Sequence, residues 1–309
     1  MNIQQIPWDA LTNPVMDFRP TTAVRDPALL YHDGMFHCFY TAVERRDNRY
    51  HLSVDAVCSR DLQQWSTPRR LFNSPELNFS SPGNVLRIHD RWVMCLQSYP
   101  TPPGITWGTD DSRLWLSESD DLIHWTPPHL LKPEGAQVHY ASSPRQIDPF
   151  LVEHEEKFWC CCKVQGAFAL LVSTDLLHWE EASPERPILS SADTPDGATV
   201  ENPCIIRDGD TFVLFFAPCR DGRGIGMARS NDLLHWHDVH YLSWPDLPWA
   251  PGGPTAPMVV DLRTTHGKWL MAFHGDDPRN DPHDAALGIA WSDDLTHWVC
   301  PSSPAHTIK

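Results

Sequence analysis

The apolar residues of this chain fall in short runs of strand length, separated by polar turns rich in Gly, Pro, Asn and Asp. Several neighbouring runs are joined by hairpin signals, such as His32-Asp33-Gly34 and Arg207-Asp208-Gly209. No segment shows the length and the 3.6-residue period of a long amphipathic helix. The pattern therefore predicts an all-β protein built from antiparallel hairpins.

One heptapeptide pattern, S-x-D-L-x-x-W, recurs after groups of these runs. Its five copies are Ser59–Trp65, Ser119–Trp125, Ser173–Trp179, Ser230–Trp236 and Ser292–Trp298. Successive Trp residues of the pattern lie 60, 54, 57 and 62 positions apart. A repeat of about 50–60 residues with strand-like flanks is typical of the blades of a β-propeller.

A second repeat keeps step with the first. Roughly thirty to forty residues before each of these Trp residues, a Pro opens an apolar run; the five openings are Asp26-Pro27, Ser81-Pro82, Asp148-Pro149, Asn202-Pro203 and Ala256-Pro257. Each unit therefore predicts a strand A, a hairpin, a strand B, a strand C that ends in the heptapeptide turn, and a short strand D. We predict a five-bladed β-propeller with four antiparallel strands per blade.

The repeats leave no room for a second globular domain. We expect one domain over residues 1–309, with blades at about 25–72, 80–131, 145–189, 200–244 and 255–300. The first twenty residues are expected to lie against a blade or to supply an edge strand. Long insertions occupy residues 97–113 in blade 2 and 275–284 in blade 5. Long loops on a rigid scaffold are common places for binding residues.

The composition of the chain argues against several classes of function. The formal net charge of −16, without clusters of Lys or Arg, argues against nucleic acid or an anionic membrane as a partner. No apolar stretch approaches the length of a transmembrane helix, and the first residues lack the basic and apolar regions of a signal peptide. We therefore expect a cytoplasmic protein. The nine Cys residues have neither disulfide-framework nor zinc-site spacing, and nothing in the sequence sets the oligomeric state.

Propeller geometry predicts where a site lies. The A strands line the central channel and begin at one face, and each antiparallel B strand ends at that same face. The residues that begin the A strands are Arg25, Asp26, Ser81, Ile147, Asp148, Glu201, Asn202 and Thr255. The residues expected at the ends of the B strands are Glu44, Gln97, Lys163, Gln165, Arg220 and His274. We expect these two sets to surround one axial pocket.

Three of the residues at these strand starts are acids: Asp26, Asp148 and Glu201. An Asp before a Pro commonly bonds to its local backbone, and this accounts for any one of them. Three carboxyls gathered on one axis raise each other's pKa, which does not help folding. It does help an enzyme that needs one ionised and one protonated carboxyl at the same pH. We therefore interpret the trio as catalytic.

With these residues in place, the chain resembles the five-bladed propeller glycoside hydrolases, and glycoside hydrolase family 43 in particular, over nearly its whole length. The resemblance rests on Arg25-Asp26-Pro27, Ile147-Asp148-Pro149, Val200-Glu201-Asn202-Pro203 and Ala272-Phe273-His274-Gly275. It implies an inverting glycosidase in which Asp26 is the general base and Glu201 the general acid. Asp148 would raise the pKa of the acid and orient it, with the base and acid carboxyls about 6.5–9.5 Å apart.

The same resemblance implies the remaining features of the site. Arabinofuranosides or xylosides are the implied substrates, and the two insertions favour action at the ends of short oligosaccharides or glycosides. No cofactor is required. His274 fits the place of a His below the sugar, next to a structural calcium or sodium ion in the channel, bound directly or through water. The residues expected to bind substrate are Arg25, Glu44, Gln97, Trp107, Lys163, Arg220, Trp249 and His274.

Alternatives remain open at this point. Asn202 follows the acid where family 43 commonly has Gly or Ala, and related propellers differ at this place. Arg25, Lys163 and Arg220 also suit a glycoside phosphorylase that binds phosphate, or they neutralise the acidic funnel. A retaining fructan-type hydrolase would use Asp26 as its nucleophile. A non-catalytic sugar-binding propeller is the further alternative, and the loop residues Trp107 and Trp249 either stack on sugars or fill gaps between blades.

Overall fold

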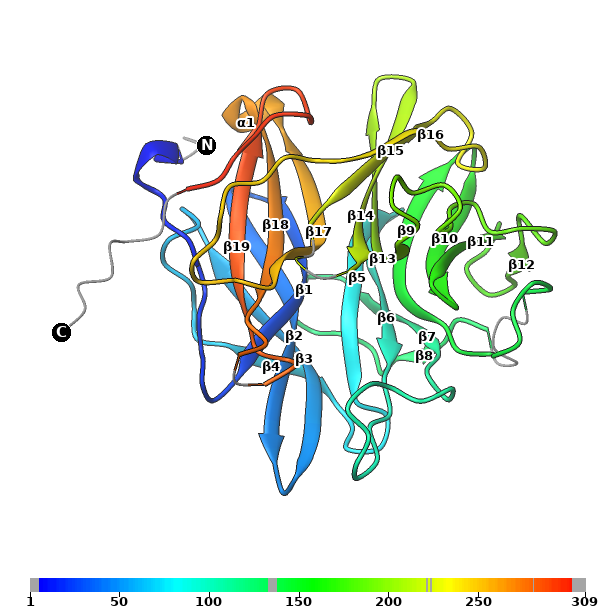
Figure 1. Ribbon diagram of the computed structural model, residues 1–309, viewed down its shortest axis with the longest axis horizontal. Helices are drawn as coiled ribbons and strands as arrows, with labels where there is room; N and C mark the ends of the chain where they lie inside the picture. The colour runs from blue at the N-terminus through cyan, green and yellow to red at the C-terminus, as the bar shows by residue number, and fades with distance from the viewer. Residues whose placement is uncertain (1–5, 133–137, 221, 223, 280, 302–309) are drawn as a thin grey trace.

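The computed structural model describes residues 6–132, 138–220, 222, 224–279 and 281–301, and its strands form five antiparallel sheets of four strands each (Figure 1). Blade 1 contains β1 (Ala23–His32), β2 (Met35–Arg46), β3 (Arg49–Ser59) and β4 (Arg69–Asn73). Blade 2 contains β5 (Phe79–Ile88), β6 (Arg91–Ser98), β7 (Leu114–Ser119) and β8 (His129–Leu130). Blade 3 contains β9 (Ile147–His154), β10 (Lys157–Val164), β11 (Ala167–Ser173) and β12 (Glu180–Glu181).

The last two blades repeat this order. Blade 4 contains β13 (Thr199–Asp208), β14 (Thr211–Cys219), β15 (Gly226–Ser230) and β16 (His237–Tyr241). Blade 5 contains β17 (Gly253–Leu262), β18 (Lys268–Asp276), β19 (Ala285–Ser292) and β20 (Trp298–Val299). The only helical turns in the described ranges are η1 (Trp8–Ala10) and α1 (Arg263–His266), and neither has the length or apolar character of a membrane span. The predicted five-bladed β-propeller is confirmed.

The heptapeptide is the turn after each C strand, and every C strand ends at its Ser. In blade 2, Ser119 Oγ accepts the backbone N–H groups of Asp121 and Leu122 at 3.2 and 2.9 Å. Asp121 Oδ1 accepts those of Ile123 and His124 at 2.8 and 2.7 Å. These side-chain acceptors replace a backbone ladder and hold Leu122 at a φ of 64°. The sequence therefore encodes this turn five times.

Each A strand begins with the same irregularity at its X-Pro step. The residue before the Pro has a positive φ in every blade: Asp26 46°, Ser81 39°, Asp148 53°, Asn202 52° and Ala256 49°. In blade 1 the two residues Asp26 and Pro27 lie opposite Tyr40 alone, which is a β-bulge. A bulge re-aims the side chain of its extra residue, so the five steps present five side chains at the axis.

The core lies between neighbouring blades, and the middle strands supply much of it. Side chains with almost no exposure come from β2 (Phe36, Phe39, Tyr40), β14 (Phe215, Phe216) and β18 (Trp269, Phe273). In β10 the three consecutive residues Cys160, Cys161 and Cys162 are fully buried and alternate between the two faces of the sheet. They act as small apolar residues of the core.

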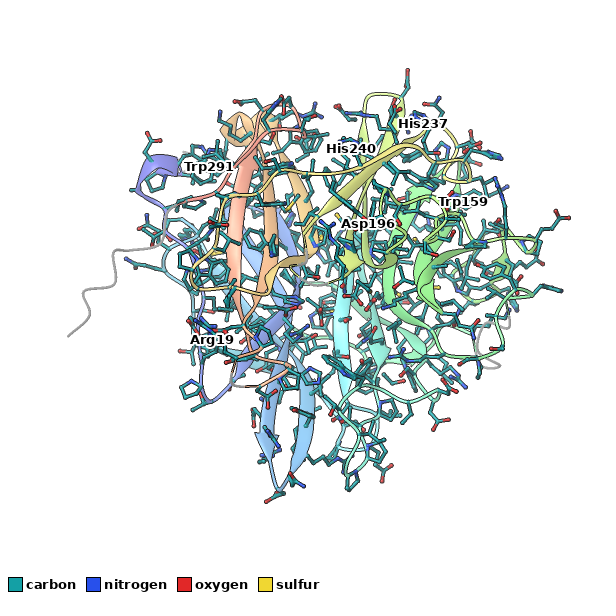
Figure 2. All side chains as sticks on the ribbon, viewed as in Figure 1. Arg19, Trp159, Asp196, His237, His240 and Trp291 are labelled. Atoms are coloured by element: carbon teal, nitrogen blue, oxygen red, sulfur yellow. The ribbon has the colours of Figure 1, made fainter. Side chains whose placement is uncertain are left out.

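The segment before β1 packs on the last blade. Val15 N–H donates to Leu287 O at 2.9 Å, and Leu287 N–H donates to Met16 O at 2.9 Å. The ring of Trp8 lies 5.2 Å from that of Trp291, which Figure 2 labels beside the N-terminal turn. The first described residues therefore extend the edge of blade 5, while β1 itself lies beside β17 and β18 (Figure 1). These contacts close the ring of blades.

Gly83 provides a test of the close approach between blades 2 and 3. A Cβ at this position would overlap the backbone carbonyl of Pro149, which cannot move without displacing the start of β9. We expect Gly83→Ala to lower the free energy of unfolding by about 3 kcal/mol in a denaturant titration. Gly224→Ala is the matched control, because its Cβ would meet only Arg220 Nη2 at 3.8 Å. Equal stabilities of the two variants would contradict the packing described here.

Candidate functional site

A cavity of about 240 Å³ opens at the mouth of the central channel, where strands β1, β5, β9 and β13 begin. Its lining comes from all five blades and comprises Arg25, Asp26, Thr41, Val43, Leu52, Ser80, Ser81, Gln97, Tyr99, Trp107, Arg145, Ile147, Asp148, Lys163, Glu201, Asn202 and His283. A smaller cavity lined by the five X-Pro steps continues from it along the axis. Asp26, Asp148 and Glu201 thus face one pocket.

The carboxyl of Asp26 is held by two hydroxyl groups. Thr41 Oγ1 donates to Asp26 Oδ2 at 2.9 Å, and Ser81 Oγ donates to the same oxygen at 3.0 Å. The backbone N–H of Asp26 donates to His274 Nδ1 at 3.0 Å. Together with the bulge, these contacts fix the direction of the carboxyl while its side chain keeps 18% exposure to the pocket.

Asp148 is the most buried carboxyl of the three. Its backbone N–H donates to Gln97 Oε1 at 2.6 Å, and Asn202 N–H reaches its Oδ2 at 3.4 Å. Burial raises the pKa of Asp148 to about 7; the charge of Lys163 opposes this shift, and the charges of Glu201 and Asp26 add to it. Asp148 therefore keeps a proton up to near neutral pH.

Glu201 is paired with a cation. Lys163 Nζ lies 2.7 Å from Glu201 Oε2, and the two side chains are only 14% and 16% exposed. Burial alone would lower the pKa of Lys163, but the charges of Glu201 and Asp148 outweigh it and raise that pKa. Lys163 is thus a permanent cation beside two carboxyls. Because its pKa is raised to about 7, Asp148 holds a proton below about pH 7 and releases it above.

The three acids do not hold equivalent positions in their strands. Asp26 and Asp148 both precede the Pro of their blades, but Glu201 lies one residue earlier, because Asn202 occupies the place before Pro203. Glu201 is therefore equivalent to Arg25 in blade 1 and not to Asp26. Its longer side chain and its different starting point bring its carboxyl to the same pocket from the neighbouring position.

The register also corrects three expected B-strand residues. The residues paired across the start of each A strand are Thr41, Gln97, Lys163, Ala217 and His274. Glu44 and Arg220 lie three residues beyond this level, Gln165 lies two residues beyond it, and none of the three lines the pocket. Glu44 instead pairs with Arg70 at 2.7 Å, and Arg220 pairs with Asp196, also at 2.7 Å.

Thr41 was missed, although the sequence carries a signal for it. Counting back from the His32–Met35 hairpin through one extra residue at Asp26-Pro27 pairs Arg25 with Thr41. The expectation placed the end of the strand at Glu44, because the apolar run after Phe36 continues that far. Tyr99, Arg145 and His283 were missed because they come from loops, whose course the repeat pattern does not set.

His274 lies behind the pocket wall. It is 1% exposed and does not line the cavity; its Nδ1 accepts the Asp26 N–H, and its Nε2 lies 3.3 Å from Asp276 Oδ1. Burial and the nearby charge of Arg25 lower the pKa of His274, so the ring is neutral. A ring nitrogen that accepts a backbone N–H has no lone pair for a cation. Among the described residues, no three His, Cys, Asp or Glu side chains gather as metal ligands.

The two loop Trp residues have different surroundings. Trp107, in the insertion of blade 2, lines the pocket with 47% exposure and lies 4.4 Å from the ring of His283. His283 Nε2 also donates to Thr106 O at 2.8 Å, which ties the insertion of blade 5 to that of blade 2. Trp249 is 6% exposed and stacks on Phe273, so it fills a gap in blade 5 and does not reach the pocket.

Arg25 lines the pocket, but its guanidinium is paired with Asp276, which does not line the pocket. Its Nη1 lies 2.9 Å from Asp276 Oδ1 and donates to His283 O at 3.2 Å. Burial and the charge of Arg25 together lower the pKa of His283 to about 4, so His283 is a neutral donor to Thr106 O. Arg25 therefore joins β1, β18 and the insertion of blade 5 into one wall.

Comparison with solved structures finds proteins that share this fold. A thermostable family-43 glycoside hydrolase matches with a TM-score of 0.66 at 16% identity, covering 96% of this chain and 97% of that one. An exo-1,5-α-L-arabinanase from a bovine ruminal metagenomic library matches with a TM-score of 0.65 at 18% identity, covering 91% and 97%. The catalytic domain of a family-62 α-L-arabinofuranosidase from Coprinopsis cinerea gives 0.64 at 13% identity, covering 92% and 94%.

These three structures share the fold with this chain along nearly the full length of both partners. At such identities the likeness shows the fold and no more. No protein-family model matches the sequence, and no curated protein sequence matches it.

The raised pKa of Asp148 predicts how stability depends on pH. An unfolded Asp has a pKa of about 3.9, so folding takes up a proton at Asp148 between that value and about 7. This contribution to stability is complete below about pH 4 and is lost as the pH rises to about 7. Asp148→Asn removes it, so the difference in unfolding free energy between variant and wild type should change across this window.

Denaturant titrations of both proteins from pH 4 to 8 measure this difference. Asp120→Asn is the control, because its side chain is 83% exposed and its curve should parallel that of the wild type. A parallel curve for Asp148→Asn as well would contradict the raised pKa.

Proposed function

We propose that this protein is a glycoside hydrolase that acts at the ends of short oligosaccharides or glycosides. The observation that carries the proposal is the convergence of Asp26, Asp148 and Glu201 on one small pocket at the channel mouth. Glycoside hydrolysis needs a pair of carboxyls in different protonation states on either side of the scissile bond. A site that holds one carboxyl protonated near neutrality, beside others in different surroundings, meets that need.

Asp26 is the proposed general base. Thr41 and Ser81 both donate to Oδ2, so that oxygen is oriented while Oδ1 is left for a water molecule in the pocket. In an inverting mechanism this water attacks the anomeric carbon while Asp26 takes its proton, with the two carboxyls about 6.5–9.5 Å apart. A retaining mechanism would instead place the Asp26 carboxylate itself on the anomeric carbon.

Glu201 is the proposed general acid, with Asp148 as its modulator. Lys163 favours the ionised form of Glu201, and Asp148, whose pKa is raised, holds a proton in the free protein. A sugar oxygen that enters beside Glu201 competes for Lys163 and replaces part of that ion pair. Glu201 then takes the proton from Asp148, which is left ionised, and delivers it to the leaving oxygen.

The size of the pocket supports action at a chain end. Its volume of about 240 Å³ is below the roughly 300–1,000 Å³ of pockets that enclose drug-sized ligands, so it suits a terminal sugar better than a long chain. Trp107 supplies an exposed indole face at its rim, which can stack on a sugar ring. The names of the arabinanase and the arabinofuranosidase support arabinofuranosides as the first substrates to test, and xylosides are tested beside them.

The phosphorylase alternative is less well supported. Of its three expected cations, Lys163 is paired with Glu201, Arg25 is paired with Asp276, and Arg220 lies outside the pocket.

A screen of aryl glycosides with and without phosphate, with the product anomer determined by NMR, separates the alternatives. Phosphate-independent release with inversion supports the proposal. Retention of the anomeric configuration would indicate the fructan-type mechanism.

Asp26→Asn tests the base. The amide can still accept the Thr41 and Ser81 hydroxyls but cannot take a proton, so we expect turnover to fall by about 10²–10⁴-fold while ligand binding persists. Glu44→Gln is the matched control, because Glu44 lies in β2 of the same blade but outside the pocket. Unchanged turnover in Asp26→Asn would exclude the assignment of the base.

Glu201→Gln tests the acid through the leaving group. A general acid speeds the reaction more when the leaving oxygen is more basic. The turnover rate of the variant should therefore fall by about 10²–10⁴-fold with alkyl glycosides and far less with dinitrophenyl glycosides. Steady-state rates over a series of leaving groups measure this dependence. Equal losses across the series would show that Glu201 acts by another route.

A further inference from the structure

One cation on the wall of the pocket has no matching carboxylate. Within the described part of the chain, three Lys or Arg side chains line the cavity: Arg25, Arg145 and Lys163. Arg25 is paired with Asp276 at 2.9 Å, and Lys163 is paired with Glu201 at 2.7 Å. Arg145 makes no ion pair with any carboxylate of the described residues. Its charge is therefore available to a ligand.

The surroundings of Arg145 leave part of its guanidinium unsatisfied. The guanidinium carbon lies 5.4 Å from the centre of the Tyr99 ring, which lines the same pocket. Its Nε is buried and has no hydrogen-bond partner among the described residues. A buried donor without an acceptor destabilises the free protein, and a ligand that brings an acceptor removes this cost.

The backbone around Arg145 is held in place from blade 2. Arg145 N–H donates to Ser143 Oγ at 3.1 Å, and Ser143 Oγ donates to Asp110 Oδ1 at 2.8 Å. Gln146 N–H donates to Ser112 O at 3.2 Å. The backbone that carries the Arg145 side chain is thus held before a ligand arrives, which lowers the entropy lost on binding.

Neutralisation of the three carboxyls in the pocket does not explain why Arg145 lies there. Glu201 already has Lys163, and Asp26 already has the hydroxyls of Thr41 and Ser81. Within the described part of the chain, no hydrogen bond joins the Arg145 side chain to Asp148. A cation placed only to neutralise these acids would pair with one of them.

We infer that Arg145 binds a carboxylate carried by the substrate, so that the pocket accepts glycosides that contain an acidic sugar. This inference rests on the proposed function for its substrate class, and it adds a charge requirement to it. A guanidinium donates two parallel hydrogen bonds to a carboxylate, which gives both charge and direction. Tyr99 and Trp107 supply aromatic faces for the sugar ring in the same cavity.

A sugar carboxylate fits better than inorganic phosphate. Arg145 offers one unpaired positive charge, whereas a phosphate group carries about −1.5 to −2 at neutral pH and usually draws on several cations. The other cations of the described pocket lining are already paired. Phosphate is therefore an arm of the test and not the proposed ligand.

The test uses ligand pairs that differ by one carboxylate group. Methyl β-D-glucuronide is compared with methyl β-D-xyloside, and methyl β-D-galacturonide with methyl α-L-arabinopyranoside, by calorimetric titration of the Asp26→Asn protein. We expect the acidic member of at least one pair to bind roughly tenfold to a hundredfold more tightly. Arg145→Gln in the same background should abolish the preference, and Arg145→Lys should restore part of it. Inorganic phosphate is titrated alongside.

Arg220→Gln is the matched control. Arg220 also lies over a Tyr ring, at 4.2 Å from the centre of Tyr241, but it is paired with Asp196 outside the pocket. This variant should keep the full preference for acidic ligands. The p-nitrophenyl glycosides of the same sugars, assayed with the wild-type protein, show whether the preference extends to kcat/KM.

Each outcome decides a separate question. Equal binding of acidic and neutral members in both pairs, or a preference that survives Arg145→Gln, would overturn the inference. Phosphate binding that depends on Arg145, without a preference for uronides, would overturn it in favour of a phosphate site. A preference in binding without hydrolysis of any glycoside would remove the proposed function and leave the inference intact.

Discussion

The site depends on one backbone feature, the bulge at the X-Pro step that begins each A strand. A regular antiparallel strand would send alternate side chains into the spaces between blades. The bulge, with its residue in the left-handed region, turns one side chain from each blade toward the axis. Because the step recurs in Ser81 and Ala256 as well as in the two Asp residues, it belongs to the fold. The chemistry comes from which residues occupy it.

Charge balance shapes the pocket as strongly as geometry. A protein with a formal charge of −16 places three carboxyls at one channel mouth, yet the same lining contains three cations. Lys163 stabilises the charge on Glu201, while burial keeps the proton on Asp148. Asp26 is held by hydroxyl groups and not by a cation. Three carboxyls in three environments can take three different roles at one pH.

The loops supply what the repeated blades cannot. Residues of the insertions in blades 2 and 5 meet at His283, which contacts both Trp107 and Thr106. The segment that carries Arg145 is bonded to the same insertion of blade 2 through Asp110 and Ser112. Repeats build the five-sided scaffold, and these unique segments close the pocket around it. Substrate preference is therefore expected to follow the loops, as is usual for loops on rigid scaffolds.

The sequence by itself determined the five blades, the strand order, the heptapeptide turns and the gathering of Asp26, Asp148 and Glu201 at one mouth. These follow from local rules repeated five times, since turn chemistry and strand alternation act over a few residues. Only the tertiary structure decided that Thr41 and not Glu44 faces the pocket, that His274 and Trp249 lie behind its wall, and that Arg145 belongs to it. Those outcomes depend on bulges that shift the register and on contacts between segments far apart in the chain, which no local pattern encodes.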